Sequence, residues 1–208
     1  MSAPSLGVIA PRIGIVRSYP RRCEIVHENA PTNHVYEVIS GTACTYKVLK
    51  YGRRQINGFY FTGDVFGLES VAKCPLAAEA ITKTEIRIFN KQTLTASASF
   101  NGEVTHLLLT LTARQLARQE NLFFSLSRTA EDRIVHFIVE MIERAPPKDG
   151  RIALPMGRQD IADYLGLSIE TVSRVLHDLE RRGAIKIKGY RSIALRNQFV
   201  EGRTARSF

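Results

Sequence analysis

Cysteine is scarce in this sequence, and no long apolar run occurs. The three cysteines, Cys23, Cys44 and Cys74, are widely spaced and form no C-x-x-C pair, so the clustered thiolates of an iron–sulfur centre are missing. An odd, small number of cysteines fits a reducing cytoplasm better than a disulfide scaffold. No apolar run approaches the roughly 18 residues of a membrane span, and the first residues lack the pattern of a signal peptide. These absences predict a cytoplasmic protein with no membrane partner.

The five histidines show no metal-binding spacing. A cupin-type enzyme would need closely spaced histidines, such as H-x-H, and a carboxylate on inward-facing strands. No such pair is present, and no hydrolytic or redox constellation is visible. We therefore expect a protein that is not an enzyme and has no metal or cofactor, with a cupin-like enzyme as the disfavoured alternative.

Positive charge is abundant. The 208 residues include 29 Lys and Arg against 20 Asp and Glu, which gives a formal net charge of +9. This balance favours a polyanionic partner, although basicity alone is a weak signal. The hydrophobic fraction of 44% is ordinary for a protein that buries one large or two modest cores.

Residues 158–182 have the pattern of two short helices joined by a tight turn. Gly166 can take the left-handed conformation that ends the first helix. Ser168 stands where the second helix needs an N-cap, and Glu170 places a negative charge in its first turn. An apolar stripe then recurs at helical spacing, formed by Val172, Val175, Leu176 and Leu179. The pattern predicts a helix-turn-helix whose second helix enters the major groove of DNA.

A second face of that helix carries Glu170, Ser173, Arg174 and His177. Arginine can bond O6 and N7 of guanine, glutamate can accept from N4 of cytosine, and serine can pair with several bases. Taken alone, these residues would suit the solvated face of an ordinary helical hairpin. The turn glycine, the cap, the apolar stripe and the segment that follows favour DNA recognition.

A basic two-stranded hairpin follows the second helix. Lys186 and Lys188 alternate with isoleucines, and apolar residues from Ile193 onward mirror them across a turn at Gly189. A hairpin just after a recognition helix is a wing, and its lysines suit contacts to DNA phosphates.

Short β-type runs punctuated by glycine fill the N-terminal half of the sequence. Many short strands at turn spacing predict a β-sandwich, barrel or roll. The expected strands are residues 35–39, 44–49, 55–61, 77–81 and 84–89.

Beyond Asn101 the periodicity becomes helical. A helix of about residues 102–126 has apolar residues on more than one face, so it must bury more than one face. One imperfect seam is formed by Val104, Leu108, Leu111, Gln115 and Leu122. A second amphipathic helix at 129–144 and a short strand at 151–154 precede the helix-turn-helix.

These motifs resemble a known family. The stretch IADYLGLSIETVSRVLHDLERRGAI looks like the C-terminal winged helix of the CRP/FNR family of bacterial transcription regulators, and E-T-V-S-R (170–174) resembles its FNR-type reading head. The segment VYEVISGTACTYKVLKYGRRQINGFYFTGDVFGLES resembles the β-roll sensor domain of the same family. The phrase LPMGRQDIADYLGL is most similar to the nitrogen-fixation regulator (FixK) branch.

The resemblance implies an α+β fold. It places an N-terminal antiparallel β-roll of the cyclic-nucleotide-binding kind at residues 13–100 and a long dimerisation helix at 101–127. A winged helix-turn-helix DNA-binding domain at 128–197 and a flexible tail at 198–208 would follow. It also implies a homodimer that contacts RNA polymerase and activates transcription from a TTGA–N4–TCAA-like palindrome in double-stranded DNA. The seam from Val104 to Leu122 would then pair with its twin, and the alternative is a helix that packs only within one chain.

The resemblance also implies roles for individual residues. Glu170, Ser173 and Arg174 would face base pairs of the TTGA half-site, and Ile169 would offer an apolar contact, for example to a thymine methyl group. Contacts to the DNA backbone are expected from Ser168, Thr171, His177, Lys186, Lys188 and Arg158.

Cyclic-nucleotide binders of this fold carry an acidic residue and then an Arg-Ser pair after a GDVFG-like turn. Here Glu69 follows the turn, but residues 73–79 read KCPLAAE and contain no Arg-Ser pair. We therefore expect control without a cyclic nucleotide, through abundance or thiol chemistry. The alternative is a ligand-gated regulator with a small effector in the β-roll.

Overall fold

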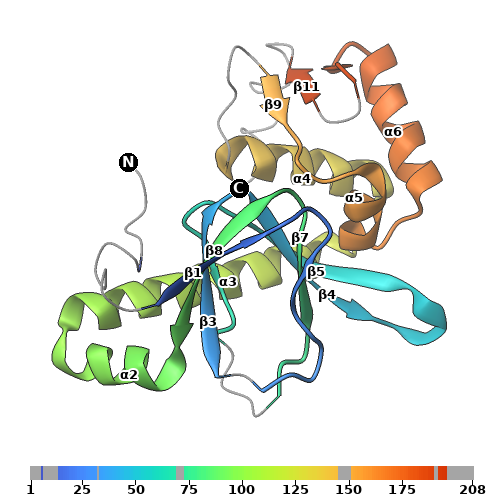
Figure 1. Cartoon of the computed structure of the whole chain (residues 1–208). Helices are drawn as coiled ribbons and strands as arrows, with labels where there is room; N and C mark the ends of the chain where they lie inside the picture. Colours follow the sequence, from blue (N-terminus) through green and yellow to red (C-terminus); the bar gives the residue numbers. More distant parts are fainter. Residues whose placement is uncertain are drawn as a thin grey trace. The chain divides into compact units, whose positions relative to one another are not determined.

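The computed structural model describes Leu6 and residues 14–31, 33–68, 73–144, 151–189 and 192–195. The chain divides into two compact units, Met1–Asn121 and Leu122–Phe208. The expected α+β fold is confirmed, with an antiparallel roll, a long helix and a C-terminal winged helix-turn-helix (Figure 1). The domain limits expected from the sequence stay a prediction, and the tail at 198–208 lies outside the described residues.

The first unit is a roll of two four-stranded sheets. One sheet has the strand order β1-β8-β3-β6 and the other has the order β2-β7-β4-β5. The tip of the β4–β5 hairpin projects away from the roll (Figure 1). The strands are β1 (Ile15–Tyr19), β2 (Glu24–Val26), β3 (His34–Ser40), β4 (Thr42–Val48), β5 (Arg54–Phe61), β6 (Val65–Phe66), β7 (Ala77–Ala80) and β8 (Thr84–Asn90).

Two hydrophobic clusters use opposite faces of the first sheet, because neighbouring residues of a strand point to opposite sides. Val38 of β3 and Ile86 of β8 pair across the sheet and join the cluster that packs the two sheets together. Val35 and Phe89, which also pair, join a second cluster with Leu94 and the long helix. Both faces of this sheet are therefore buried along part of its length.

Helix α2 (Lys91–Phe100) was not predicted from the sequence. Asn90 caps it, because its side-chain oxygen accepts from the backbone N–H of Gln92 at 2.9 Å and of Thr93 at 3.3 Å. Leu94 is its one buried residue. The helix thus lacks the repeating apolar stripe by which amphipathic helices are recognised in a sequence.

Helix α3 (Gly102–Ser125) lays one face on the roll. Val104, Leu107 and Leu111 are buried in the cluster with Val35 and Phe89. Farther along, Nη2 of Arg118 lies 2.9 Å from Oδ1 of Asp64, whose other oxygen accepts from a backbone N–H in the same turn. An apolar contact and an ion pair therefore fasten α3 to the roll.

The second unit holds three helices and a small antiparallel sheet of order β10-β11-β9. Helix α6 packs on both α4 and α5. The amphipathic helix predicted at 129–144 is confirmed as α4, whose apolar face is buried at Ile134, Phe137, Ile138 and Met141. The elements are α4 (Ala130–Arg144), β9 (Arg151–Ala153), α5 (Arg158–Leu165), α6 (Ile169–Arg181), β10 (Ile185–Ile187) and β11 (Ser192–Leu195).

Candidate nucleic-acid interface

Fixed caps set the turn between α5 and α6. Gly166 has a φ of +65°, in the left-handed region, and its N–H donates to the carbonyl of Ala162. The hydroxyl of Ser168 accepts from the backbone N–H of Thr171 at 3.2 Å. At the other end of α5, the buried carboxylate of Asp160 accepts from the backbone N–H of Gly157 at 2.8 Å. The turn and cap predicted at Gly166 and Ser168 are thus confirmed.

Helix α6 has one buried face and one face open to solvent. Val172, Leu176 and Leu179 are buried, which holds the helix on its own unit. The opposite face presents the predicted base-reading residues: Ile169, Glu170 and Arg174 are exposed and Ser173 is half-buried. Ile169, Glu170 and Arg174 can therefore contact a surface outside the unit.

The Glu170 carboxylate is ionised under ordinary conditions. It accepts a hydrogen bond from its own backbone N–H and another from the Ser168 side chain, and both lower its pKa. A carboxylate in this state is only an acceptor. It therefore suits an amino group such as N4 of cytosine.

Two further contacts tie this face to its surroundings. Arg158, the first residue of α5, donates from Nη1 to Oγ of Ser173 at 3.3 Å. Glu180, one turn after the exposed His177, accepts at Oε1 from the backbone N–H of Ile187 at 2.8 Å. The first contact links α5 to the face of α6 that carries the predicted base-reading residues (the reading face). The second links α6 to strand β10.

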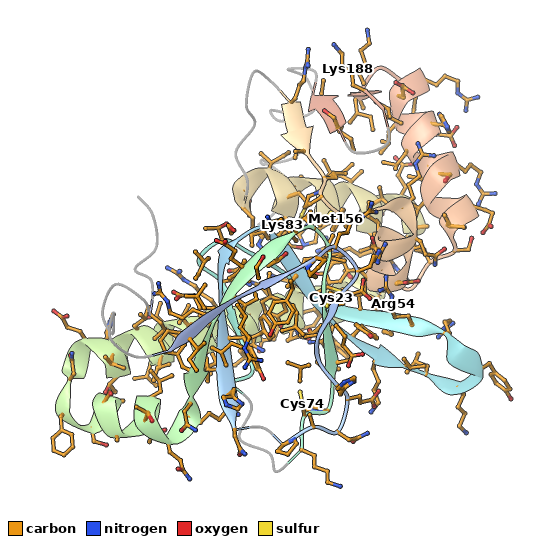
Figure 2. All side chains as sticks on the ribbon, in the orientation of Figure 1. Cys23, Arg54, Cys74, Lys83, Met156 and Lys188 are labelled. Carbon is orange, nitrogen blue, oxygen red and sulfur yellow. The ribbon has the colours of Figure 1, made fainter. Side chains whose placement is uncertain are left out.

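The wing presents a basic surface. Ile185 and Ile193 are buried, whereas Lys186 and Lys188 are exposed. The backbone N–H of Lys188 donates to the carbonyl of Ser192 at 2.8 Å, which closes the hairpin. Figure 2 shows Lys188 at the end of the wing. The predicted alternation of apolar and basic residues is confirmed for the described part of the hairpin.

The residues expected to form a dimer contact on α3 have different surroundings. Val104 and Leu111 are buried against the roll of the same chain, and Leu108 packs against the same cluster. Gln115 and Leu122 are half-buried. Another set of apolar side chains on α3 is open to solvent: Leu109 (67% exposed), Leu116 (60%) and Phe123 (70%).

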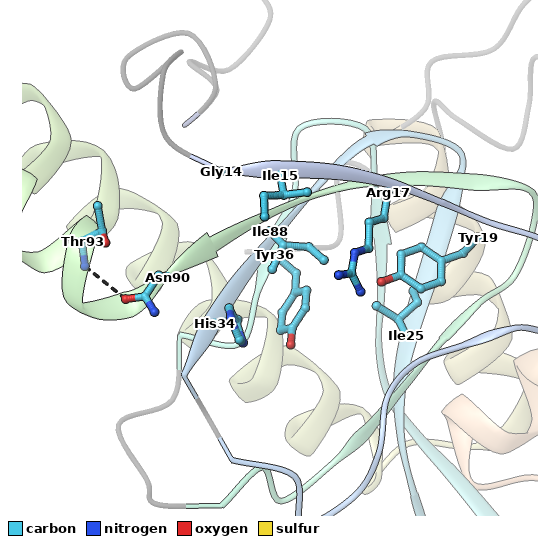
Figure 3. A pocket seen from close by; sticks show the side chains of 10 residues that line it. All are labelled: Gly14, Ile15, Arg17, Tyr19, Ile25, His34, Tyr36, Ile88, Asn90 and Thr93. Carbon is cyan, nitrogen blue, oxygen red and sulfur yellow. Dashed lines mark hydrogen bonds between the residues drawn. The ribbon is translucent and has the colours of Figure 1, made fainter.

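A pocket of about 540 Å³ opens on the first sheet of the roll. Figure 3 shows the Arg17 guanidinium between the rings of Tyr19 and Tyr36. Burial, the neighbouring Tyr19 hydroxyl and the Cys74 thiol raise the pKa of Tyr36 to about 12, against the opposing effect of Arg17. The Tyr36 phenol is therefore neutral at physiological pH. The pocket contains no residue from the 73–79 stretch where a cyclic phosphate would bind in this fold.

The thiols are not grouped. Cys44 is buried, Cys23 and Cys74 are half-buried, and all three are free. Cys23 and Cys74 lie well apart in Figure 2. Within the described ranges, no group of three His, Cys, Asp or Glu side chains could hold a metal ion.

Comparison with known proteins follows the same division of the chain. Residues 132–198 match the model of a Crp-like helix-turn-helix domain, and residues 16–97 match that of a cyclic nucleotide-binding domain. The nitrogen fixation regulation protein FixK of Rhizobium meliloti (strain 1021) is 38% identical over 181 residues, which cover 86% of this chain and 82% of that protein. The chain belongs to the CRP/FNR family of transcription regulators.

Other CRP/FNR relatives agree with this assignment. The structure of FixK2 from Bradyrhizobium japonicum is 42% identical, has a TM-score of 0.85, and the match covers 91% of this chain and 96% of that one. The transcriptional activatory protein AadR of Rhodopseudomonas palustris is 34% identical over 176 residues, which cover 83% of this chain and 73% of that protein. The resemblance to the FixK branch is thus confirmed, and the chain is a DNA-binding regulator rather than an enzyme.

One contact of this CRP/FNR chain was missed in the sequence. The hydrogen bond between Arg158 and Ser173 joins residues 15 positions apart, and no pattern of spacing reveals it. The apolar residues Leu109, Leu116 and Phe123, which the sequence places outside the predicted seam of the long helix, form an exposed face with a seven-residue repeat. Among the described residues, every helix is too short or too polar to span a lipid bilayer.

Proposed function

We propose that two copies of this chain bind one palindromic site of the TTGA–N4–TCAA kind and regulate transcription from it. The observation that carries the proposal is the face of α6 that exposes Glu170 and Arg174 while Val172, Leu176 and Leu179 hold the helix in its unit. A helix held in this way can enter a major groove without unpacking. Two such helices in successive major grooves would read a palindrome.

Each base-reading residue has a role that fits its chemistry. Arg174, exposed and long, bonds O6 and N7 of guanine, and the ionised Glu170 accepts from N4 of the cytosine that pairs with this guanine. Ile169, 36% exposed, contacts a thymine methyl group. Ser173 is the fourth base-reading residue.

The backbone contacts surround this face. Residues at the start of a helix and on a basic hairpin are well suited to phosphates, since helix N-termini and lysines both attract anions. We assign phosphate contacts to Ser168, Thr171, His177, Lys186 and Lys188. Arg158 was expected among them, but its guanidinium donates to Ser173.

Dimerisation through α3 uses a face that the described residues of the chain leave exposed. Val104 and Leu111 are already occupied by the roll. Leu109, Leu116 and Phe123 recur every seven residues on α3, which is the spacing of a two-helix contact. We therefore place the centre of the dimer contact on these three side chains, with Leu108, Gln115 and Leu122 at its side. RNA polymerase is the further partner, by analogy with the family.

A ligand-gated form of the same function is the second candidate. The pocket lined by Arg17, Tyr19 and Tyr36 is the observation that favours it, because a guanidinium and two phenols suit a small organic acid. Calorimetric titration with benzoate, compared between the wild type and Arg17→Gln, tests it. Saturable binding that needs Arg17 and changes DNA affinity would favour gating, and no binding favours control without an effector.

The proposed function is tested by fluorescence anisotropy on a TTGA–N4–TCAA duplex without any added effector. A scrambled duplex of the same composition is the control, at moderate salt because phosphate contacts make all affinities depend on salt. We expect tight, selective binding with two chains on each duplex. Equal, weak binding to both duplexes would contradict the proposal.

A further inference from the structure

The side chains of Arg158 and Ser173 connect helices α5 and α6 of the helix-turn-helix. Arg158 opens α5 directly after the capped Gly157, so its backbone position is fixed. Its Nη1 donates to Oγ of Ser173 over 3.3 Å, and both residues are half-buried. Within the described residues, this is the one hydrogen bond or ion pair of the Arg158 side chain.

Ser173 uses its hydroxyl differently from several hydroxyl residues inside the described helices. A serine or threonine within a helix commonly donates its proton to the carbonyl four residues earlier. In the described helices, four residues do so at 2.8–3.1 Å, and Thr105 does so at 3.4 Å beside a shorter bond to Ala98; the four are Ser97, Ser99, Thr110 and Thr112. Among the described contacts, Ser173 makes no such bond and instead accepts from Arg158.

The direction of this hydrogen bond decides what Ser173 can recognise. A guanidinium has only donors, so the bond occupies an acceptor site of the Ser173 oxygen and leaves the hydroxyl proton available. A donor that carries a positive charge also polarises the hydroxyl. The hydroxyl is then set to donate to a base acceptor, such as O4 of thymine or N7 of a purine, rather than to accept from an amino group.

We propose that Arg158 is a positioning residue for base recognition, which fixes the Ser173 hydroxyl as a hydrogen-bond donor, and not a phosphate contact. The inference rests on the proposed function, since it concerns the same reading face. It predicts that Arg158 and Ser173 act as one unit at one base pair of each half-site. A phosphate contact would instead strengthen binding to every sequence alike.

The test compares DNA binding of the wild type, Arg158→Ala, Ser173→Ala and the double variant. The site is first obtained by selection from random duplexes with the wild type, so the test does not depend on the TTGA sequence. Each half-site position is then varied, and the affinity ratio between the preferred and the other bases is measured. Gln159→Ala, an exposed neighbour on α5, is the control, and thermal unfolding checks that every variant folds.

We expect Ser173→Ala to lower the affinity ratio at one position by about threefold to tenfold, the effect of one hydrogen bond. Arg158→Ala should lower the ratio at the same position, and in the Ser173→Ala background it should have no further effect. The slope of log affinity against log salt should not change, because the same phosphates stay bound.

Two results would overturn the inference. A uniform loss of affinity for all duplexes with Arg158→Ala, and a salt slope reduced by about 0.9 for each phosphate that is no longer neutralised, would make Arg158 a phosphate ligand. Independent, additive effects of the two single variants on the affinity ratio would separate Arg158 from Ser173. If the selection with the wild type yields no preferred site, the proposed function itself fails, which is a distinct outcome from either.

Discussion

The second unit, which holds the winged helix-turn-helix (the winged unit), and the first unit (the roll unit) are specified by different kinds of signal in the sequence. In the winged unit, local signals agree: Gly166 adopts a positive φ, Ser168 caps α6, and an apolar stripe of the expected period is buried. In the roll unit, the decisive contacts join residues far apart in sequence, such as Val35 with Phe89 and Asp64 with Arg118. A local sequence pattern predicts helices, strands and turns. It does not predict which elements pack against each other when they are far apart in the sequence.

Helix α3 has both a buried face and an exposed face. A pair of substitutions, one on each face, can separate their roles. Leu107 is 3% exposed in the roll cluster and Leu109 is 67% exposed. Leu107→Ala should lower the free energy of unfolding by about 2–5 kcal/mol, as is usual when a buried leucine is truncated. Leu109→Ala should leave this intramolecular packing intact and weaken the dimer instead.

Thermal unfolding and sedimentation velocity over a range of concentrations separate these effects. Leu107→Ala is expected to affect the first measurement and Leu109→Ala the second. A dimer that is as tight with Leu109→Ala as in the wild type would remove that side chain from the proposed contact.

On the reading face, Arg174→Ala should cost about 1–3 kcal/mol of binding to the preferred site and relax selection at its guanine. The reason is that an exposed guanidinium with no role in the core contributes only through what it bonds outside the unit. Anisotropy titrations with duplexes altered at each half-site position measure this. Unchanged affinity and selectivity would show that Arg174 does not read a base.

The roll should respond to alkaline pH through Tyr36. Its pKa is raised to about 12 in the folded chain from the ordinary value of 10.0, so folding favours the protonated phenol. The stabilisation is complete below about pH 10 and is lost as pH rises toward 12. Because Tyr36 is partly exposed, we expect an effect of less than about 2 kcal/mol.

Urea unfolding from pH 8 to pH 11.5 measures this effect, with Tyr36→Phe as the variant. The phenylalanine keeps the ring that stacks on Phe66 with centroids 5.0 Å apart. Its free energy of unfolding should fall less with pH than that of the wild type. Parallel curves for the two proteins would contradict a raised pKa of Tyr36.

The smallest expected effect concerns the wing. Lys188→Ala should weaken binding to all sequences alike and lower the salt slope by about 0.9 for each phosphate that is no longer neutralised, hence by about 1.8 in a dimer. Lys186→Ala should act in the same way. Titrations at several salt concentrations measure the slope, and an unchanged slope would show that the wing does not contact the DNA.

Much of the fold was predictable because several signals coincided. The strands from β3 to β8 were largely expected, with the two-residue β6 as the exception, since glycines separate their runs. Helix α2 was missed because only Leu94 is buried in it, and β2 is too short to show an alternating pattern. The seam through Val104 and Leu111 suggests a dimer contact in the sequence, because a sequence shows apolar spacing but not that the roll covers these residues.

The candidate site follows the same division. The cap at Ser168 and the exposed positions of Glu170 and Arg174 follow from helix periodicity, so they could be predicted from the sequence. The partner of Ser173 does not follow from periodicity, because it comes from another helix.

The central claim is that the reading helices of two chains bind one duplex together, in successive major grooves. The most direct test changes only the spacer, comparing TTGA–N4–TCAA with a duplex in which five base pairs are added between the same half-sites. Five base pairs turn one half-site to the opposite side of the DNA, since a helical turn is about 10 base pairs. We predict that the selective binding of two chains is lost with the longer spacer, and equal affinity for the two duplexes would contradict the account.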